Sequence, residues 1–336
     1  MNVPFDLLKV ALLAGAGWVV ATALRRRPAT TRHDLWLLVV LGSVLVPVTE
    51  LMLPRFYFGI PASFAPLEAA GGQWLPVVFG LWALWALVSA ARVSVGLLEL
   101  RRIARQGERW SNPELDRALA HAARLAGVTR AVTLVRSDAV QIPATWGVRR
   151  PVVALPAAAV GWSPERLRLV LLHELVHVRR QDALVEGVVW LASALYWFHP
   201  ALWLATRRLR LERERACDEA VLATGARASD YCGHLIDIMR AATTRARGAV
   251  VGAAMAAPCT LEHRVRAMLA RPLPQASHMA PRTDGQGDRS RTPRSGLGTP
   301  LLLAGAAAIY ALGALAPCAF VGDEAGARQT TSGTAP

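Results

Sequence analysis

The sequence predicts an α-helical integral membrane protein with a mostly helical domain that contains a small β-sheet. Hydrophobic residues make up 53% of the 336 residues and charged residues only 18%. The apolar residues gather in long blocks, as they do in membrane spans, and arginines follow these blocks directly, as in cytoplasmic loops. Residues 101–271 instead carry helix caps and short β-branched runs, which are typical of a folded domain.

Three apolar blocks in residues 1–100 are long enough to cross a bilayer: residues 5–24, 35–53 and 74–98. The net charge of +14 comes almost entirely from arginine. Because positive charge retains a loop in the cytoplasm, we expect a multi-pass plasma-membrane protein with its N-terminus outside and residues 101–271 inside. The position of the arginines beside apolar blocks favours the lipid bilayer as their partner, so no direct nucleic-acid binding is expected.

Two helices of the predicted domain have clear start and stop signals. Asn112 can cap a helix that begins at Pro113 and ends before Gly127. Ser163 can cap a second helix, which runs to about Arg180. Shorter or charged helices are expected near residues 207–224, 230–242 and 261–269.

The β-branched runs at residues 131–136 and 151–155 predict two strands of the small sheet. Between them lie Ala144, Thr145, Trp146 and Gly147, which we interpret as part of an edge strand. Such a strand could align a peptide substrate by strand addition. The alternative is an ordinary edge strand without a role in binding.

The second predicted helix carries the pattern HExxH at residues 173–177. Two histidines four residues apart lie on one face of a helix, so His173 and His177 can bind a single zinc ion, and Glu174 can act as a base toward water. The alternative is a helix that carries two histidines without a metal. A zinc site also needs a third protein ligand and an open position.

Residues 214–218 (ERACD) offer that third ligand. Glu214 and Asp218 are four residues apart and share a helix face. Glu214 can then bind zinc while Asp218 accepts a hydrogen bond from a ligating histidine. The alternative is a solvated charge cluster stabilised by ion pairs along the helix.

Two further polar residues lie near these motifs. Asp182 could orient a ligating histidine, or it could pair with Arg179 or Arg180. His199 could contact the substrate or the reaction oxyanion, or it could cap a helix or lie at an interface.

The apolar stretch at residues 183–206 poses a question of topology. If it crossed the membrane, Glu214 would lie on the opposite side from His173 and His177. The following arginines would also lie outside, against the positive-inside rule. Because Pro200 disrupts a continuing helix, the sequence predicts a membrane-associated helical hairpin near residues 183–206.

At these positions the sequence resembles the BlaR/MecR-type regulatory membrane zinc metallopeptidases, which act as antirepressors. The resemblance rests on HELVH at 173–177, ERACD at 214–218, the strand pair within 143–156 and the three N-terminal spans, and it covers roughly residues 1–320. It implies an HExxH zinc-peptidase domain that binds one zinc ion. By the resemblance the ligands are His173, His177 and Glu214, the general base is Glu174 and a supporting residue is Asp218.

Three segments are expected after the domain. Residues 272–298 predict a flexible linker, residues 299–320 a transmembrane helix, and residues 321–336 a short extracytoplasmic tail. The best-known members of the resembled family carry a penicillin-binding sensor domain outside the cell. So short a tail has no room for such a domain, so we expect no β-lactam sensing.

The motifs and the resemblance together predict a zinc metalloendopeptidase that hydrolyses a protein or peptide substrate. As a regulatory enzyme it would cleave a cytoplasmic transcriptional repressor or itself. One alternative is a housekeeping membrane protease for misfolded or lipid-modified proteins. Another is a non-catalytic membrane receptor or scaffold with a structural zinc, which the intact Glu174 disfavours because a closed structural site needs no base.

Overall fold

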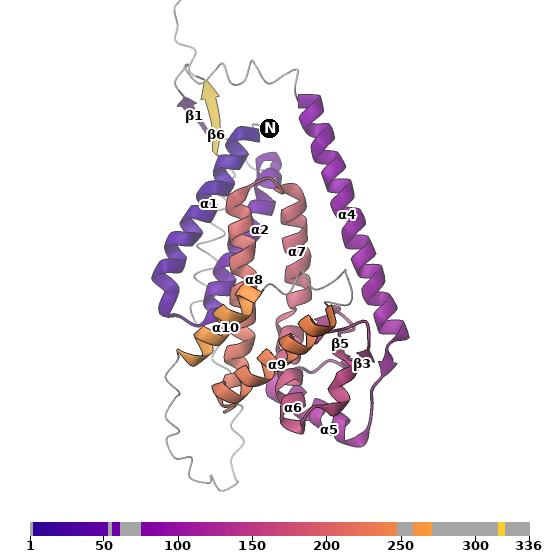
Figure 1. Cartoon of the computed structure of the whole chain (residues 1–336). Coiled ribbons are helices and arrows are strands. Elements are labelled where there is room, and N and C mark those ends of the chain that lie inside the picture. Colours follow the sequence, from indigo (N-terminus) through magenta and orange to yellow (C-terminus); the bar gives the residue numbers. More distant parts are fainter. Residues whose placement is uncertain (1–2, 53–55, 61–74, 247–257, 271–314, 320–336) are drawn as a thin grey trace, which may run out of the picture.

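The computed structural model describes residues 3–52, 56–60, 75–246, 258–270 and 315–319, and it is mostly helical with a small mixed sheet, which confirms the predicted fold class (Figure 1). The helices are α1 (Val3–Ala23), η1 (Leu24–Arg26), α2 (Ala29–Met52), α4 (Leu75–Gln106), α5 (Pro113–Ala126), η3 (Ala157–Gly161), α6 (Pro164–Arg180), α7 (Asp182–Leu195), α8 (Pro200–Leu222), α9 (Ala228–Ala246) and α10 (Pro258–Leu269).

Three of the described helices are long and apolar enough to cross a membrane. They cover Asp6–Arg26, Ala29–Thr49 and Pro76–Gln106, and they coincide with the three predicted blocks. α4 continues past the apolar block to Gln106 because its arginines extend the same helix. Many leucine and valine side chains of α4 are exposed, as expected for a surface that faces lipid.

The chain reverses direction between Leu195 and Pro200. Pro200 is the first residue of α8, where its missing N–H and fixed φ are best tolerated. α7 has 14 residues and is therefore about 21 Å long, shorter than the roughly 30 Å hydrocarbon layer. Both helices pack against α1 and α2 in one apolar cluster, which includes Val10, Trp36, Val189 and Leu209. Whether this hairpin lies in the membrane stays a prediction.

A second apolar cluster surrounds the small sheet and α6. The sheet has the order β2-β3-β5-β4, formed by Glu108–Arg109, Thr133–Ser137, Val152–Pro156 and Ala144–Trp146 respectively. β3 and β5 are parallel, whereas β2 and β4 pair antiparallel with their neighbours. β4 therefore lies at an edge, as the sequence predicts. The short strand β2 was not predicted, because two exposed residues leave no alternating pattern.

The helix signals of the sequence are confirmed around this sheet. The Asn112 side chain accepts a 2.7 Å hydrogen bond from the Leu115 N–H, and α5 ends at Gly127 with φ of 71°. The Ser163 hydroxyl accepts a 3.2 Å hydrogen bond from the Arg166 N–H at the start of α6. These caps fix where α6 begins and therefore which of its faces meets the sheet.

The predicted C-terminal segments lie mostly outside the described residues. This holds for the linker at 272–298, for residues 299–314 of the predicted span and for the tail at 321–336. Leu315–Ala319 are described, and they form a strand, β6, parallel to β1 (Phe56–Ile60). Over these five residues the structure differs from the predicted helix. Pro317 accounts for this, because it lacks an N–H and disfavours helical backbone in the residue before it.

A strained residue joins α6 to α7. Gln181 has φ of 58°, the only positive φ at a described non-glycine residue, and its N–H closes α6 by bonding to the Val178 carbonyl at 3.2 Å. We expect Gln181→Val to lower the free energy of unfolding by about 1–2 kcal/mol, because a β-branched residue is disfavoured in this region.

Gln181→Gly is the matched control, because glycine adopts this backbone without strain. Thermal unfolding in a non-ionic detergent should give a lower midpoint for the valine variant and an equal or higher midpoint for the glycine variant. Equal midpoints for the two variants would mean that the left-handed backbone conformation at position 181 does not affect stability.

Candidate metal centre

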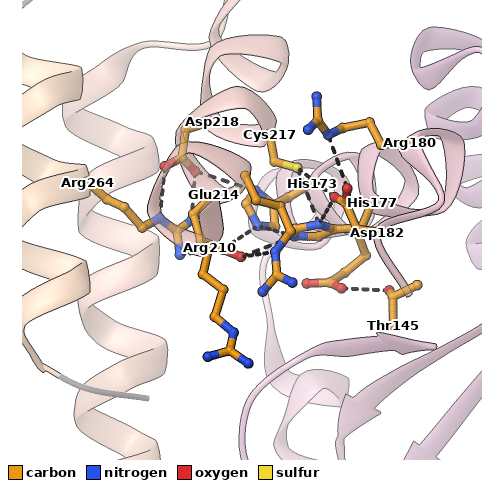
Figure 2. Close-up of polar contacts among 12 residues, drawn as sticks. Thr145, His173, His177, Arg180, Asp182, Arg210, Glu214, Cys217, Asp218 and Arg264 are labelled. Atoms are coloured by element: carbon orange, nitrogen blue, oxygen red, sulfur yellow. Dashed lines mark hydrogen bonds and ion pairs between the residues drawn. The ribbon is translucent and has the colours of Figure 1, made fainter. Parts of the chain in front are cut away.

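The crossing of α6 and α8 brings two histidines and a glutamate together (Figure 2). His173 and His177 lie one turn apart on α6, and their Nε2 atoms are 3.2 Å apart. Glu214 on α8 lies opposite, with carboxylate oxygens 3.7 Å from His173 Nε2 and 3.9 Å from His177 Nε2. The structure thus groups the three residues that the sequence singled out as metal ligands.

Each histidine is held through its other ring nitrogen. His177 Nδ1 lies 2.7 Å from a carboxylate oxygen of Asp182, which can only accept. His173 Nδ1 lies 2.9 Å from the Tyr231 hydroxyl, which donates its own proton to Asp218 at 2.9 Å. From these partners we infer that both histidines carry their proton on Nδ1.

The consequence concerns the two Nε2 atoms. If both protons are on Nδ1, two Nε2 lone pairs and a carboxylate face one point, and a cation at that point would remove their mutual repulsion. A tetrahedral zinc site with bonds of roughly 2 Å spaces its ligand atoms about 3.3 Å apart. The separations of 3.2, 3.7 and 3.9 Å are close to this spacing. The donor set of two imidazoles and one carboxylate therefore fits zinc.

Two arginines contact Glu214. Arg213 Nε is 3.2 Å from one carboxylate oxygen, and Arg264 Nη1 is 3.3 Å from the other. Burial alone would raise the pKa of Glu214, but positive charge, first on His177 and then on Arg264, holds this pKa well below its ordinary value. The carboxylate is therefore available in the anionic form that a metal needs.

The charged groups around Glu214 also shift the pKa of His177. Burial alone would lower its pKa, but the neighbouring Cys217 and Glu214 and the hydrogen bond to Asp182 raise the pKa of His177 well above its ordinary value. In the absence of a cation the site therefore favours a second proton on the Nε2 atom of His177, and a metal ion that binds there displaces this proton.

Asp218 is held from two sides. Arg264, on α10, forms a bidentate pair with it through contacts of 2.8 and 2.7 Å, and the Tyr231 hydroxyl donates to the same carboxylate. Burial and the charge of Asp218 raise the pKa of Tyr231 well above its ordinary value, so the phenol stays protonated. The expected supporting contact of Asp218 with a histidine is seen both directly, with 3.4 Å between His173 Nδ1 and an Asp218 oxygen, and through the Tyr231 hydroxyl.

Glu174 points to the other side of the site, toward the sheet. Its carboxylate accepts a 2.6 Å hydrogen bond from the Thr145 hydroxyl on β4, and the Glu174 side chain is buried. The predicted base and the predicted substrate strand are therefore in direct contact through Thr145. Ala144 and Trp146 pair with β5 on either side of it, and Gly147 follows the strand in a left-handed conformation with φ of 88°.

A second group of possible ligands shares His177 with the first. Cys217 Sγ lies 3.4 Å from His177 Nδ1 and 3.9 Å from Asp182. Burial raises the pKa of the Cys217 thiol, whereas a thiol binds metal as the thiolate. The group of His173, His177 and Glu214 is therefore the better metal site.

The two remaining sequence candidates have different outcomes. Asp182 contacts His177 and also lies 3.4 Å from Arg180 Nε, so both interpretations apply to it. His199 directly precedes α8, at the end of that helix that is far from Glu214, and its Nε2 contacts the Leu7 carbonyl of α1 at 3.1 Å. This contact agrees with the interface alternative, and the suggested contact of His199 with substrate stays a prediction.

Sequence reasoning missed Tyr231 and Arg264. Both fall within helices that the sequence predicts, but they meet Asp218 across 13 and 46 residues of chain. No local pattern marks such long-range contacts. The sequence offered only the presence of a tyrosine and an arginine in two short predicted helices, and this does not identify their partner.

Comparison with known proteins fits this geometry. The family model described as BlaR1 peptidase M56 matches residues 62–268, which include α6, α8 and the sheet. The chain belongs to this family. The M56 family resemblance expected from the motifs is therefore confirmed, and it supports a membrane-bound metallopeptidase.

The M56 relatives share part of their length with the chain. The regulatory protein BlaR1 of Bacillus licheniformis is 32% identical over 146 residues, which cover 44% of this chain and 24% of that protein. The methicillin resistance mecR1 proteins of Staphylococcus aureus and Staphylococcus epidermidis are 26% identical over 92 residues, 27% of this chain and 16% of theirs. The chain thus matches about a quarter or less of these relatives.

The contact between Asp182 and His177 predicts an effect on metal affinity. Asp182→Ala should weaken zinc binding by roughly 10–100-fold, because His177 loses the carboxylate that fixes its orientation and proton. The measurement is competition between the purified full chain and a zinc-binding dye. Asp237→Ala, which removes an exposed carboxylate paired with Arg166, is the matched control. Equal affinities of the two variants would contradict the proposed role of Asp182.

Proposed function

We propose that this M56 family protein is a membrane-embedded zinc metalloendopeptidase of the regulatory kind, which cleaves a cytoplasmic transcriptional repressor or itself. One observation carries the proposal. His173, His177 and Glu214 converge on one point, and Glu174, between the two histidines in sequence, is oriented by a hydroxyl on an edge strand. A purely structural metal site has no use for this fourth residue.

The reaction is hydrolysis of a peptide bond. His173, His177 and Glu214 would hold one zinc ion, which would supply Lewis-acid activation of water and of the scissile carbonyl. Glu174 accepts a proton at its carboxylate and later gives it to the leaving amine. The Thr145 hydroxyl donates to one Glu174 oxygen and leaves the other oxygen free for this proton. Asp182, Tyr231 and Asp218 keep the histidines in orientation.

The substrate enters as an extended chain along β4. This strand pairs only with β5 among the described strands, so its other side offers backbone donors and acceptors. A peptide added there by strand addition passes Thr145 and therefore Glu174. Because strand addition uses main-chain bonds, it suits a protein substrate better than a small molecule. Ala144, Thr145, Trp146 and Gly147 are the proposed substrate strand.

The regulatory function is favoured over housekeeping proteolysis by the relatives, since the Bacillus licheniformis relative is named a regulatory protein. A repressor substrate is reached only from the cytoplasm, so the peptidase domain, residues 101–271, is placed there. The proposed domains are otherwise those of the sequence: three spans in residues 1–100, a membrane-associated hairpin near 183–206, a linker, a last span that does not include the strand Leu315–Ala319, and an external tail.

Catalysis is tested by removing the base and keeping the ligands. Glu174→Gln should retain about one zinc per chain and lose proteolysis by a factor of roughly 10²–10⁴. Zinc is measured by mass spectrometry of the metal, and substrates are found by comparing the proteomes of cells that carry wild type or variant. Glu165→Gln, in the first turn of the same helix, is the matched control and should cleave normally.

Either of two results would contradict the assignment. Undiminished cleavage by the Glu174→Gln variant would place the base elsewhere. Full zinc content after His177→Ala would place the metal elsewhere.

Topology is tested by cysteine labelling, because a zinc–ligand bond of about 2 Å cannot join residues across a layer of roughly 30 Å. In a chain without its native cysteines, Arg179→Cys and Arg207→Cys are exposed positions before and after the hairpin. Both should react only from the cytoplasmic side, and Ala62→Cys, between the predicted spans at 35–53 and 74–98, should react only from outside. Labelling of position 207 from outside and 179 from inside would exclude Glu214 as a ligand.

A further inference from the structure

A basic cavity lies where η1 meets α8 and α10. Its volume is about 370 Å³, within the range of small-molecule sites. Figure 1 shows α10 beside the turn that joins α1 and α2. Six arginines line the cavity: Arg25, Arg26, Arg27, Arg32, Arg215 and Arg264. So many positive side chains around one hollow require negative charge to balance them.

The acidic side chains of the protein only partly balance this charge. Arg32 and Arg215 share one carboxylate, that of Glu212, at 2.8 and 2.9 Å. Arg264 is paired with Asp218, and Glu219 receives the N–H of Ala29 at 3.1 Å. Arg264 also contacts Glu214 at 3.3 Å, so among the described residues the six arginines face four carboxylates, and the cavity keeps a positive charge.

Several donors of the cavity have no partner among the residues that the structure describes. The side chains of Arg25, Arg26 and Arg27 are exposed, and within the described part of the chain they make no hydrogen bond or ion pair. Arg215 Nε is buried and also lacks a hydrogen-bond partner among the described residues. Buried donors are normally satisfied, so this nitrogen is a second sign of a missing acceptor.

The position of the cavity limits what can supply that acceptor. η1 connects the candidate spans Asp6–Arg26 and Ala29–Thr49 directly. The cavity therefore opens where two helices leave the hydrocarbon layer, at the level of lipid phosphates. Basic pockets at this level between membrane helices bind anionic headgroups. The planar guanidinium of arginine also suits phosphate, because its N–H groups can bind two oxygens at once.

We propose that this cavity is a phosphate-binding site whose ligand is the headgroup phosphate of an anionic phospholipid. Arg25, Arg26 and Arg27 supply the free charge, and Arg215 supplies a buried donor. A lipid headgroup and free phosphate both present a tetrahedral phosphate oxyanion to the arginines. The lipid is the favoured ligand because the cavity lies at the ends of two candidate spans. The site is independent of zinc and of proteolysis, so it stands or falls apart from the proposed function.

The test is a calorimetric titration of the full chain in a non-ionic detergent. The probes are dioctanoyl phosphatidylglycerol, inorganic phosphate and dioctanoylglycerol, which has the same tails without phosphate. We expect saturable binding of phosphatidylglycerol and none of dioctanoylglycerol. R25Q/R26Q/R27Q should weaken the binding by roughly tenfold or more, because each arginine at a membrane surface contributes about fivefold. R215Q should weaken it as well.

Two controls keep the result interpretable. R101Q/R102Q/R105Q removes the same charge beside another candidate span, outside this cavity, and should bind as wild type does. R25K/R26K/R27K keeps the charge that orients the spans and loses the paired N–H donors, so it should bind less tightly than wild type while inserting normally. It replaces the glutamine variant if that variant fails to insert.

The outcomes separate the sources of the phosphate. Tight binding of phosphatidylglycerol with weak binding of inorganic phosphate supports a lipid ligand, and equal affinities support a phosphate site that is filled from solution. The proposal is overturned if wild type shows no saturable binding, if dioctanoylglycerol binds equally, or if the two glutamine triple variants lose the same affinity.

Discussion

The meeting of three donor atoms from two helices is the constraint on which the rest of the structure depends. His173 and His177 come from α6, Glu214 comes from α8, and their atoms lie within 4.8 Å of one another. Between these helices the chain runs through an apolar segment. This segment has to begin and end on the same side of the membrane, because both helices contribute to one site. α7 is too short to cross a bilayer, and Gln181 and Pro200 supply the two breaks. The hairpin is thus a geometric requirement of the metal centre.

Burial of so many charges around this point also needs compensation. An unpaired buried charge is costly, and removing one member of a buried pair leaves the other without a partner. Glu214, Asp218 and Asp182 each contact at least one arginine. The two histidines provide further contacts to these carboxylates. The network therefore holds its ligands in place before any metal binds, and this reduces the ordering that binding requires.

The sequence predicted the local parts of this structure because local physics determines them. The caps at Asn112 and Ser163, the turn at Gly127 and the spacing of His173 and His177 each depend on a few neighbouring residues. The edge position of β4 followed from its place between two β-branched runs. Contacts across long stretches of chain could not be predicted, which explains why Tyr231 and Arg264 were missed.

The strand at Leu315–Ala319 was missed for a related reason, because its apolar composition is shared with membrane helices and only Pro317 argues against a helix.

α8 connects the two halves of the molecule more directly than any other described element. It has 23 residues and is therefore about 35 Å long. Its first turns pack in the cluster with α1 and α2, where His199 contacts the Leu7 carbonyl. Its last turns carry Glu214 and Asp218. Because a packed helix tends to move as a rigid body, α8 is the described element through which a displacement of α1 would reach Glu214, the proposed third ligand. Arg264 adds a second link, because it contacts Glu214 and also lines the basic cavity. Geometry thus connects the apolar helices α1 and α2 to Glu214 through α8, and to His177 through Asp182 at the start of α7.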